Sequence, residues 1–156
     1  MARSACCVLA LAGSLVHAGA LAVPSTFGTI FGNAVLCIDQ IDSAYFYEYL
    51  STSFGPPYKR EGGAYWFRAA DARLWGIELT DVIVSDDSSE LVFVAAVLEA
   101  TPEELDLAVS TAAGMHHIAV DQSAFPVRQA RPGSKIVYFN TRSKIYCLRY
   151  KQPPPG

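Results

Sequence analysis

The chain has 156 residues, of which 51% are apolar, and it carries a formal net charge of −3 with a sequence pI of about 5.5. This length predicts one domain, and the apolar share is sufficient for a buried core. The acidic pI argues against a nucleic-acid-binding protein, for which a pI above about 9 is typical.

Residues 1–22 have the pattern of a secretory signal peptide. Arg3 is followed by an apolar run and then by small residues, which offer cleavage sites after Ala20 and after Ala22. Because the run is too short to span a bilayer comfortably, a cleaved signal is favoured over a membrane anchor. We predict cleavage after Ala22, export to a bacterial periplasm or the medium, and a single domain at 23–152 that has no membrane association.

The first half of the mature chain is predicted to hold one helix and three strands. Asp42 or Ser43 caps the helix, whose apolar residues have helical spacing and which ends at Gly55. Short runs of apolar, β-branched and aromatic residues mark the strands. The predicted ranges are a strand at 34–41, the helix at 42–55, a strand at 63–69 and a strand at 74–85 that bends at Gly76.

The second half begins with the most apolar run, residues 90–100, which predicts a central strand. Thr101, Pro102 and Glu104 form the sequence signature of a capping box, and the helix that follows is expected to end at Gly114. The predicted remainder is a short segment at 116–120, a loop, a hairpin of strands 134–140 and 143–150 with its turn at 140–143, and a disordered tail at 153–156.

The order of elements is similar in the two halves. Each half opens with an apolar strand that leads into a capped helix, and each closes with a pair of strands. This order predicts an α+β fold with a mainly antiparallel sheet, built from two tandem βαββ(β)-like modules with two main helices packed on it.

Cys37 and Cys147 are the cysteines left after removal of the signal peptide. An even number in an exported protein predicts a disulfide, with two buried thiols as the alternative. Closing a loop of about 110 residues contributes roughly 4 to 5 kcal/mol in the chain-entropy model. The bond would tie the strand at 34–41 to the last strand of the chain.

Charge is distributed unevenly along the chain. Residues 74–127 contain ten acidic residues and no Lys or Arg, whereas all charged residues after Asp121 are basic. We expect the two regions to neutralise each other across the fold. The alternative is a basic strip that meets an acidic partner or a phosphate.

Three stretches resemble the vicinal-oxygen-chelate family, which includes glyoxalases and bleomycin-resistance-type binding proteins. They are IDSAYFYEYLSTSFGPP (41–57), TPEELDLAVSTAAG (101–114) and GSKIVYFNTRSKIYCLRY (133–150). The family's metal enzymes use His and Glu from the first and last strands of each module. Here the strands at 34–41 and 90–100 contain no His, and Ile145-Tyr146-Cys147 stands where the last strand would carry Glu. The resemblance therefore implies a binding scaffold without a metal or other cofactor.

His116 and His117 are the histidines of the mature chain. Adjacent strand residues point to opposite faces, so the pair is unsuited to hold one metal ion. A Ser-His-Asp arrangement of His117, Asp121 and Ser123 can be drawn, but a histidine pair beside the negative end of the preceding helix is favoured. We assign no catalytic residue, and a small exported hydrolase that uses His116 or His117 is the alternative function.

Aromatic residues are the best functional indication in this sequence. Tyr and Trp dominate binding hot spots, although some of these side chains must belong to the core. In the strand at 63–69, Tyr65 and Phe67 share one face and Trp66 takes the other. We predict a non-enzymatic protein that binds a protein partner or a small apolar ligand. The candidate residues are Tyr65, Trp66, Phe67, Trp75, Tyr138 and Tyr146.

Overall fold

The computed structural model describes residues 22–152. The predicted signal peptide, apart from Ala22, and the predicted tail at 153–156 lie outside this range. Within it the chain forms three helices and a nine-stranded antiparallel sheet, which confirms the predicted α+β class. The helices are α1 (Phe27–Val35), α2 (Ser43–Phe54) and α3 (Pro102–Ala113).

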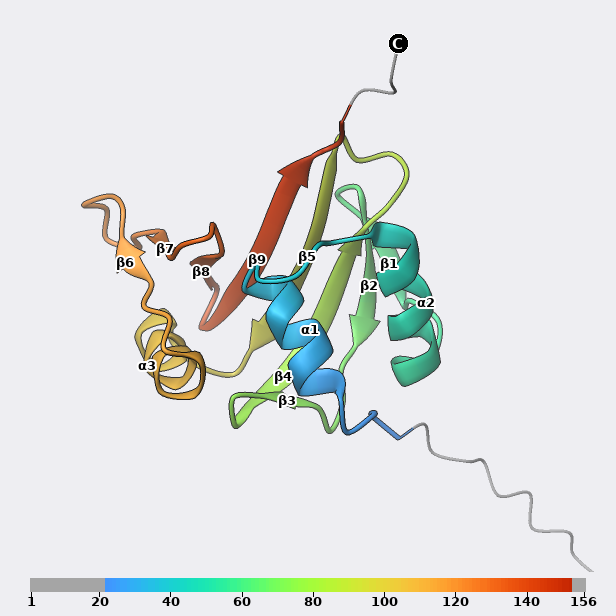
Figure 1. Cartoon of the computed structure of the whole chain (residues 1–156), viewed down its shortest axis with the longest axis horizontal. Coiled ribbons are helices and arrows are strands. Elements are labelled where there is room, and N and C mark those ends of the chain that lie inside the picture. The colour runs from blue at the N-terminus through green and yellow to red at the C-terminus, as the bar shows by residue number, and fades with distance from the viewer. Residues whose placement is uncertain (1–21, 153–156) are drawn as a thin grey trace, which may run out of the picture.

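The sheet has the order β1-β2-β4-β5-β9-β8-β7-β6, and β3 pairs with β4 beside this path (Figure 1). All of these pairings are antiparallel. The predicted central position of the run at 90–100 is confirmed, because β5 lies between β4 and β9. The strands are β1 (Lys59–Glu61), β2 (Ala64–Arg68), β3 (Arg73–Leu74), β4 (Ile77–Ser85), β5 (Leu91–Leu98), β6 (Ile118–Ala119), β7 (Arg128–Gln129), β8 (Lys135–Phe139) and β9 (Arg142–Tyr150).

Helix α1 replaces the strand that was predicted at 34–41. Its buried residues Phe27, Phe31, Ala34 and Val35 recur at helical spacing. The strand prediction is wrong because it began inside the last turn of this helix, residues 36–39 form turns and bends, and residues 40–41 have no regular structure. Since the first module lacks its opening strand, the two tandem βαββ(β) modules are not confirmed.

Helices α2 and α3 begin where their capping residues predict. Asp42 Oδ1 accepts a hydrogen bond of 2.7 Å from the backbone N–H of Tyr45. At α3, the backbone N–H of Glu104 donates to Thr101 Oγ1 (3.3 Å), and the backbone N–H of Thr101 donates to Glu104 Oε2 (2.8 Å). Gly114 ends α3 in the left-handed conformation, at φ 67°. These bonds satisfy backbone donors that the first turn of a helix leaves free.

Two hairpin turns are tighter than predicted. The segment at 74–85 is not one bent strand, because the chain reverses at Trp75 and Gly76, whose φ angles are 51° and 82°. Two consecutive positive φ angles are typical of a two-residue type I′ turn. The closing hairpin reverses at Asn140 and Thr141, so the next two residues of the predicted turn already belong to β9. The predicted loop after 120 also contains β7.

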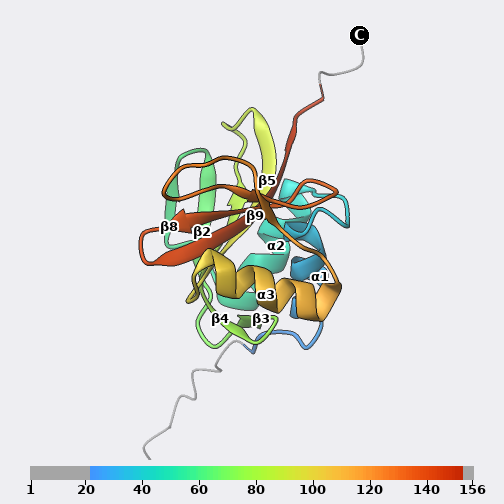
Figure 2. The same cartoon turned by 90° about the vertical axis from the view of Figure 1, so that its left-hand side faces the viewer.

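The helices pack on one face of the sheet, and the main core lies between the two layers. Helix α1 contacts β5 and β9, α2 contacts β2, β4 and β5, and α3 contacts β8 and β9. Figure 1 shows α1 and α2 in front of the strands, and Figure 2 shows α3 below the hairpin of β8 and β9. A second cluster of buried residues on the opposite face contains no residue of these helices. It consists of Ala64, Ile83, Ala95 and Val97.

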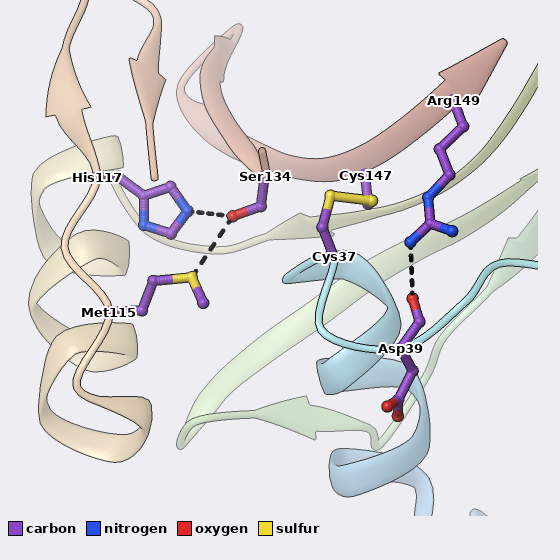
Figure 3. The surroundings of a disulfide bond; sticks show 7 residues. All are labelled: Cys37, Asp39, Met115, His117, Ser134, Cys147 and Arg149. Carbon is purple, nitrogen blue, oxygen red and sulfur yellow. Dashed lines mark hydrogen bonds between the residues drawn. A yellow bond between two sulfur atoms is a disulfide. The ribbon is translucent and has the colours of Figure 1, made fainter. Parts of the chain in front are cut away.

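The predicted disulfide between Cys37 and Cys147 is present, with 5.3 Å between the two Cα atoms (Figure 3). It ties the turn after α1, rather than a first strand, to the middle of β9. Cys147 is fully buried on the helix side of the sheet, whereas Cys37 is half-buried. Arg149 adds a second link, because its Nη2 donates to the carbonyl oxygen of Asp39 (3.4 Å).

Candidate binding site

A groove runs across the helix-free face of the sheet. Strand pairing places four residues opposite one another on the neighbouring strands β9, β5, β4 and β2: Tyr146, Ala95, Ile83 and Trp66. Large aromatic side chains stand at both ends of this row and smaller ones in the middle, so the centre is hollow. The hollow has a volume of about 530 Å³, and Phe93 and Lys144 also line it.

Lys144 is the cation of the groove. It lies two residues before Tyr146 on β9 and therefore on the same face. Its Nζ is 5.3 Å from the ring centroid of Phe139 and 5.9 Å from that of Tyr146, within the range of a cation–π contact. Burial lowers the pKa of Lys144 and raises the pKa of Tyr146. Among residues 22–152, no carboxylate oxygen lies within 4.0 Å of this Nζ.

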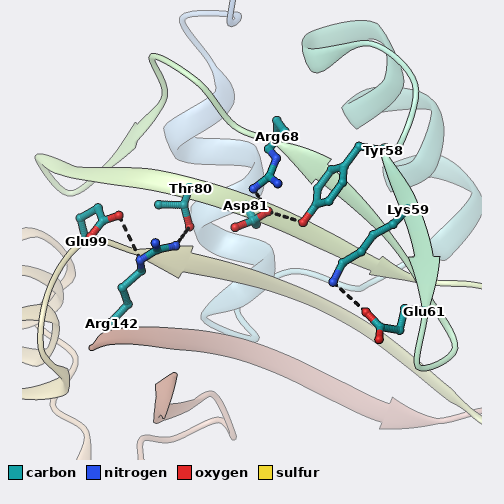
Figure 4. Close-up of polar contacts among 8 residues, drawn as sticks. All are labelled: Tyr58, Lys59, Glu61, Arg68, Thr80, Asp81, Glu99 and Arg142. Carbon is teal, nitrogen blue, oxygen red and sulfur yellow. Dashed lines mark hydrogen bonds and ion pairs between the residues drawn. The ribbon is translucent and has the colours of Figure 1, made fainter. Parts of the chain in front are cut away.

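Trp66 forms the opposite wall of the groove. Its indole Nε1 donates to the carbonyl oxygen of Glu61 (3.2 Å), and Lys59 Nζ lies 4.1 Å from its ring centroid. Lys59 also pairs with the Glu61 carboxylate at 2.7 Å and lowers the pKa of that group (Figure 4). These contacts from β1 hold the indole beside the hollow while its outer edge faces solvent.

The other carboxylates near this face are engaged by partners of their own (Figure 4). Asp81 is buried, accepts a hydrogen bond from the Tyr58 hydroxyl (2.7 Å) and lies 3.3 Å from Arg68 Nη1. Burial and this bond to Asp81 raise the pKa of Tyr58 to about 12. Glu99 pairs with Arg142 at 3.0 Å. These carboxylates are therefore engaged by other groups, whereas the ammonium group of Lys144 contacts aromatic rings.

Two of the six predicted aromatic residues, Trp66 and Tyr146, line the groove. Tyr65 and Phe67 point to the helix side, as the alternation along β2 predicts. There they pack against Tyr47 of α2, with ring centroids 4.7 and 6.0 Å from the Tyr47 ring. Phe67 is fully buried in the main core, so its prediction as a binding residue is wrong.

Trp75 and Tyr138 also lie away from the groove. Trp75 occupies the turn between β3 and β4 and is half-buried against the main core, close to Gly32 of α1. The Tyr138 hydroxyl donates to the carboxylate of Glu103 on α3 (3.1 Å). Neither residue shares a surface with Trp66, because both lie on the helix side of the molecule.

The sequence reasoning missed ten of the twelve residues that line the groove, among them Ile83, Phe93, Ala95 and Lys144. Alternation along the last strand places Lys144 on the same face as Tyr146, and this signal was available in the sequence. The small residues gave no signal of their own. Their role depends on the pairing between strands, which brings them between two aromatic walls.

His117 is a core residue of the α3–β8 contact. It is 1% exposed, and its Nε2 lies 2.7 Å from Ser134 Oγ (Figure 3). Its Nδ1 lies 3.5 Å from Asp106 Oδ1. Asp106 Oδ1 also accepts a hydrogen bond from the backbone N–H of His117 (2.6 Å). Burial lowers the pKa of His117, although the Asp106 carboxylate opposes this effect. Ser134 is fully buried as well, so its hydroxyl is not accessible to a substrate in this structure.

The arrangement of His117, Asp121 and Ser123 drawn from the sequence is wrong. Asp121 Oδ1 accepts hydrogen bonds from the backbone and hydroxyl of Ser123, and these bonds lower the pKa of Asp121. His116 is exposed. Between residues 22 and 152, no group of three or more His, Cys, Asp or Glu side chains is placed to hold a metal ion.

The acidic and basic regions of the sequence pair across the fold, which confirms the expected neutralisation for two ion pairs. Arg128 Nη2 lies 2.8 Å from Glu103 of α3, and Arg142 binds Glu99 just before the same helix. Lys151 donates to a backbone carbonyl oxygen at the other end of the sheet. The basic residues of the closing hairpin therefore do not form one free strip.

No helix in the described part of the chain is long and apolar enough to cross a membrane. Comparisons with protein-family models, with curated proteins and with solved structures found no match to the chain. The resemblance to the vicinal-oxygen-chelate family accordingly stays a prediction that rests on the three sequence stretches quoted above.

Proposed function

We propose that this chain is an exported, non-enzymatic binding protein that holds a small apolar ligand in the groove of its helix-free sheet face. The observation that carries the proposal is the row Tyr146–Ala95–Ile83–Trp66, in which two aromatic walls enclose a floor of smaller apolar side chains. An apolar hollow on an uncovered surface is typical of a site that is covered by a ligand or a partner.

The dimensions of the groove favour a small ligand over a protein partner. Pockets for small molecules have volumes of roughly 300–1,000 Å³, and the groove, at about 530 Å³, lies within this range. Export is supported by the disulfide, since such bonds persist in oxidising compartments. A second copy of the chain is the other occupant to be tested.

The test is a fluorescence titration with N-phenylnaphthylamine, a neutral apolar dye that brightens when it leaves water. We expect the wild-type protein to bind the dye and Ala95→Leu to bind it at least tenfold more weakly, because the larger side chain fills the floor of the groove. Ala70→Leu is the matched control, since Ala70 is exposed in the turn after β2 and does not line the groove.

Two results would contradict the proposal. One is equal dye affinity in the wild type and in a folded Ala95→Leu variant. The other is a wild-type protein whose dye-induced NMR shifts fall outside β2, β4, β5 and β9. The NMR measurement uses the unmodified protein, so it decides the matter even where the variant fails to fold. A sedimentation experiment that shows a dimer closed over this face would assign the groove to a second copy.

A further inference from the structure

We infer that the groove is specific for an amphiphile with an apolar chain and a single anionic head group, a carboxylate, which the ammonium group of Lys144 binds. This inference rests on the proposed function, because it assigns the chemical class of the ligand for the same groove.

The position of Lys144 is fixed by strand pairing. Lys144 stands opposite Val97 on β5 and opposite Val137 on β8, so apolar residues flank it on both sides. Its ammonium group lies near the rings of Phe139 and Tyr146. These neighbours desolvate the cation in part without providing an anion. A cation in such surroundings is stabilised when a bound anion replaces its lost hydration.

The surrounding acidic residues do not supply that anion. Glu61 is paired with Lys59, Glu99 with Arg142, and Asp81 is held by the Tyr58 hydroxyl. Lys144 is the cation that lines the hollow, and no carboxylate in residues 22–152 lies within 4.0 Å of its Nζ. A carboxylate forms a charge-assisted hydrogen bond with such an ammonium group.

The floor of the groove accommodates the apolar chain. From the Tyr146 end, the row continues across β5 and β4 to Trp66 on β2. With strands about 4.8 Å apart, these three steps span roughly 14 Å. Ala95 and Ile83 offer only hydrocarbon along this path, and the indole of Trp66 closes its far end. Phe139 lies between the ammonium group and the indole, because its ring centroid is 5.3 Å from Lys144 Nζ and 6.4 Å from the ring centroid of Trp66.

The test compares three probes that share one alkyl chain: laurate, dodecanol and dodecyltrimethylammonium, each below its micellar concentration. Binding is followed by the fluorescence of Trp66 in the oxidised protein, with Trp75→Phe introduced to leave Trp66 as the reporter. We expect laurate to bind at least tenfold more tightly than dodecanol, and dodecyltrimethylammonium to bind more weakly than either.

The variants assign the preference to one side chain. Lys144→Met keeps the apolar stem and should remove the tenfold advantage of laurate over dodecanol. Lys144→Arg should retain the advantage. Lys151→Met is the control for the loss of one positive charge, because Lys151 is exposed and does not line the groove.

The outcomes separate this inference from the proposed function. Equal affinities for laurate and dodecanol, or a laurate preference that survives in Lys144→Met, would overturn the carboxylate assignment and leave an apolar groove. Failure of all three probes to bind would overturn both. In the wild type, NMR titration of the Lys144 side chain offers a readout without a variant, since a bound carboxylate must raise the pKa of that amine.

Discussion

Removal of the disulfide between Cys37 and Cys147 should destabilise this domain by several kcal/mol. The bond joins residues 110 positions apart, at the turn after α1 and in the middle of β9. Cys37→Ala breaks it with little loss of packing, because Cys37 is half-buried and the buried Cys147 stays in place as a small apolar residue. Reduction of the wild-type protein should have nearly the same effect.

The magnitude follows from the closed loop and from the backbone at the exchanged position. In the chain-entropy model, a loop of roughly 100 residues corresponds to about 4.7 kcal/mol. Since the free energy of unfolding of native proteins is about 5–15 kcal/mol, the contribution of the disulfide is a large share of the total. Cys37 also has a φ of 59°, in the left-handed region, where a residue with a Cβ costs about 1 kcal/mol more than glycine. Cys37→Gly should therefore lose about 1 kcal/mol less than Cys37→Ala.

The assay is urea denaturation followed by circular dichroism, with and without a reductant. We expect a reductant to lower the free energy of unfolding of the wild type to that of Cys37→Ala and to leave the variant unchanged. A Cys37→Ala protein within about 1 kcal/mol of the oxidised wild type would refute the loop-closure reasoning. A Cys37→Gly protein with a lower free energy of unfolding than Cys37→Ala would refute the argument from the backbone conformation.

Two further predictions concern α3 and its contacts. Burial lowers the pKa of His117 below 6.5, so the unfolded chain binds a proton more readily there than the folded protein. Above pH 6.5 the side chain is neutral in both states, so the protein is at its full stability with respect to this group. The free energy of unfolding should fall as the pH drops from 6.5 toward the lowered pKa of His117. Urea denaturation at a series of pH values should show a weaker dependence on pH in His117→Asn. Thr101→Ala removes the capping box and should cost about 1 kcal/mol in the same assay, whereas Thr101→Ser should retain most of that stability.

The elements predicted correctly are those with their own local signals. Asp42 caps α2, and Thr101 with Glu104 caps α3, through bonds that span only three residues of sequence. The error at 34–41 has the opposite origin. Its β-branched composition favoured a strand, but Phe27 and Phe31 lie upstream, and the helix that buries them extends through Val35, after which the chain forms turns and irregular structure. Tertiary packing outweighed local propensity in that segment.

The groove was predictable only in part, for a related reason. Alternation along β2 separates Trp66 from Tyr65 and Phe67, and this separation is observed. The sequence does not indicate which of the two faces α2 covers, since that depends on where the helix packs. Nor does it indicate that Ala95 stands between aromatic residues, because pairing across four strands brings together positions that are distant in the chain.

Strand β9 links the stability of the fold to the geometry of the groove. Ile145 and Cys147 point to the helix side and are fully buried, and the disulfide joins one of them to the end of α1. Lys144 and Tyr146, which alternate with them along β9, point to the other face and line the groove. Because a slip of one residue in the pairing of a strand exchanges its two faces, the buried cysteine fixes the register that exposes the lysine. The cysteine in the closing hairpin thus affects both faces of the sheet, as a crosslink on one and through the register that places Lys144 in the groove on the other.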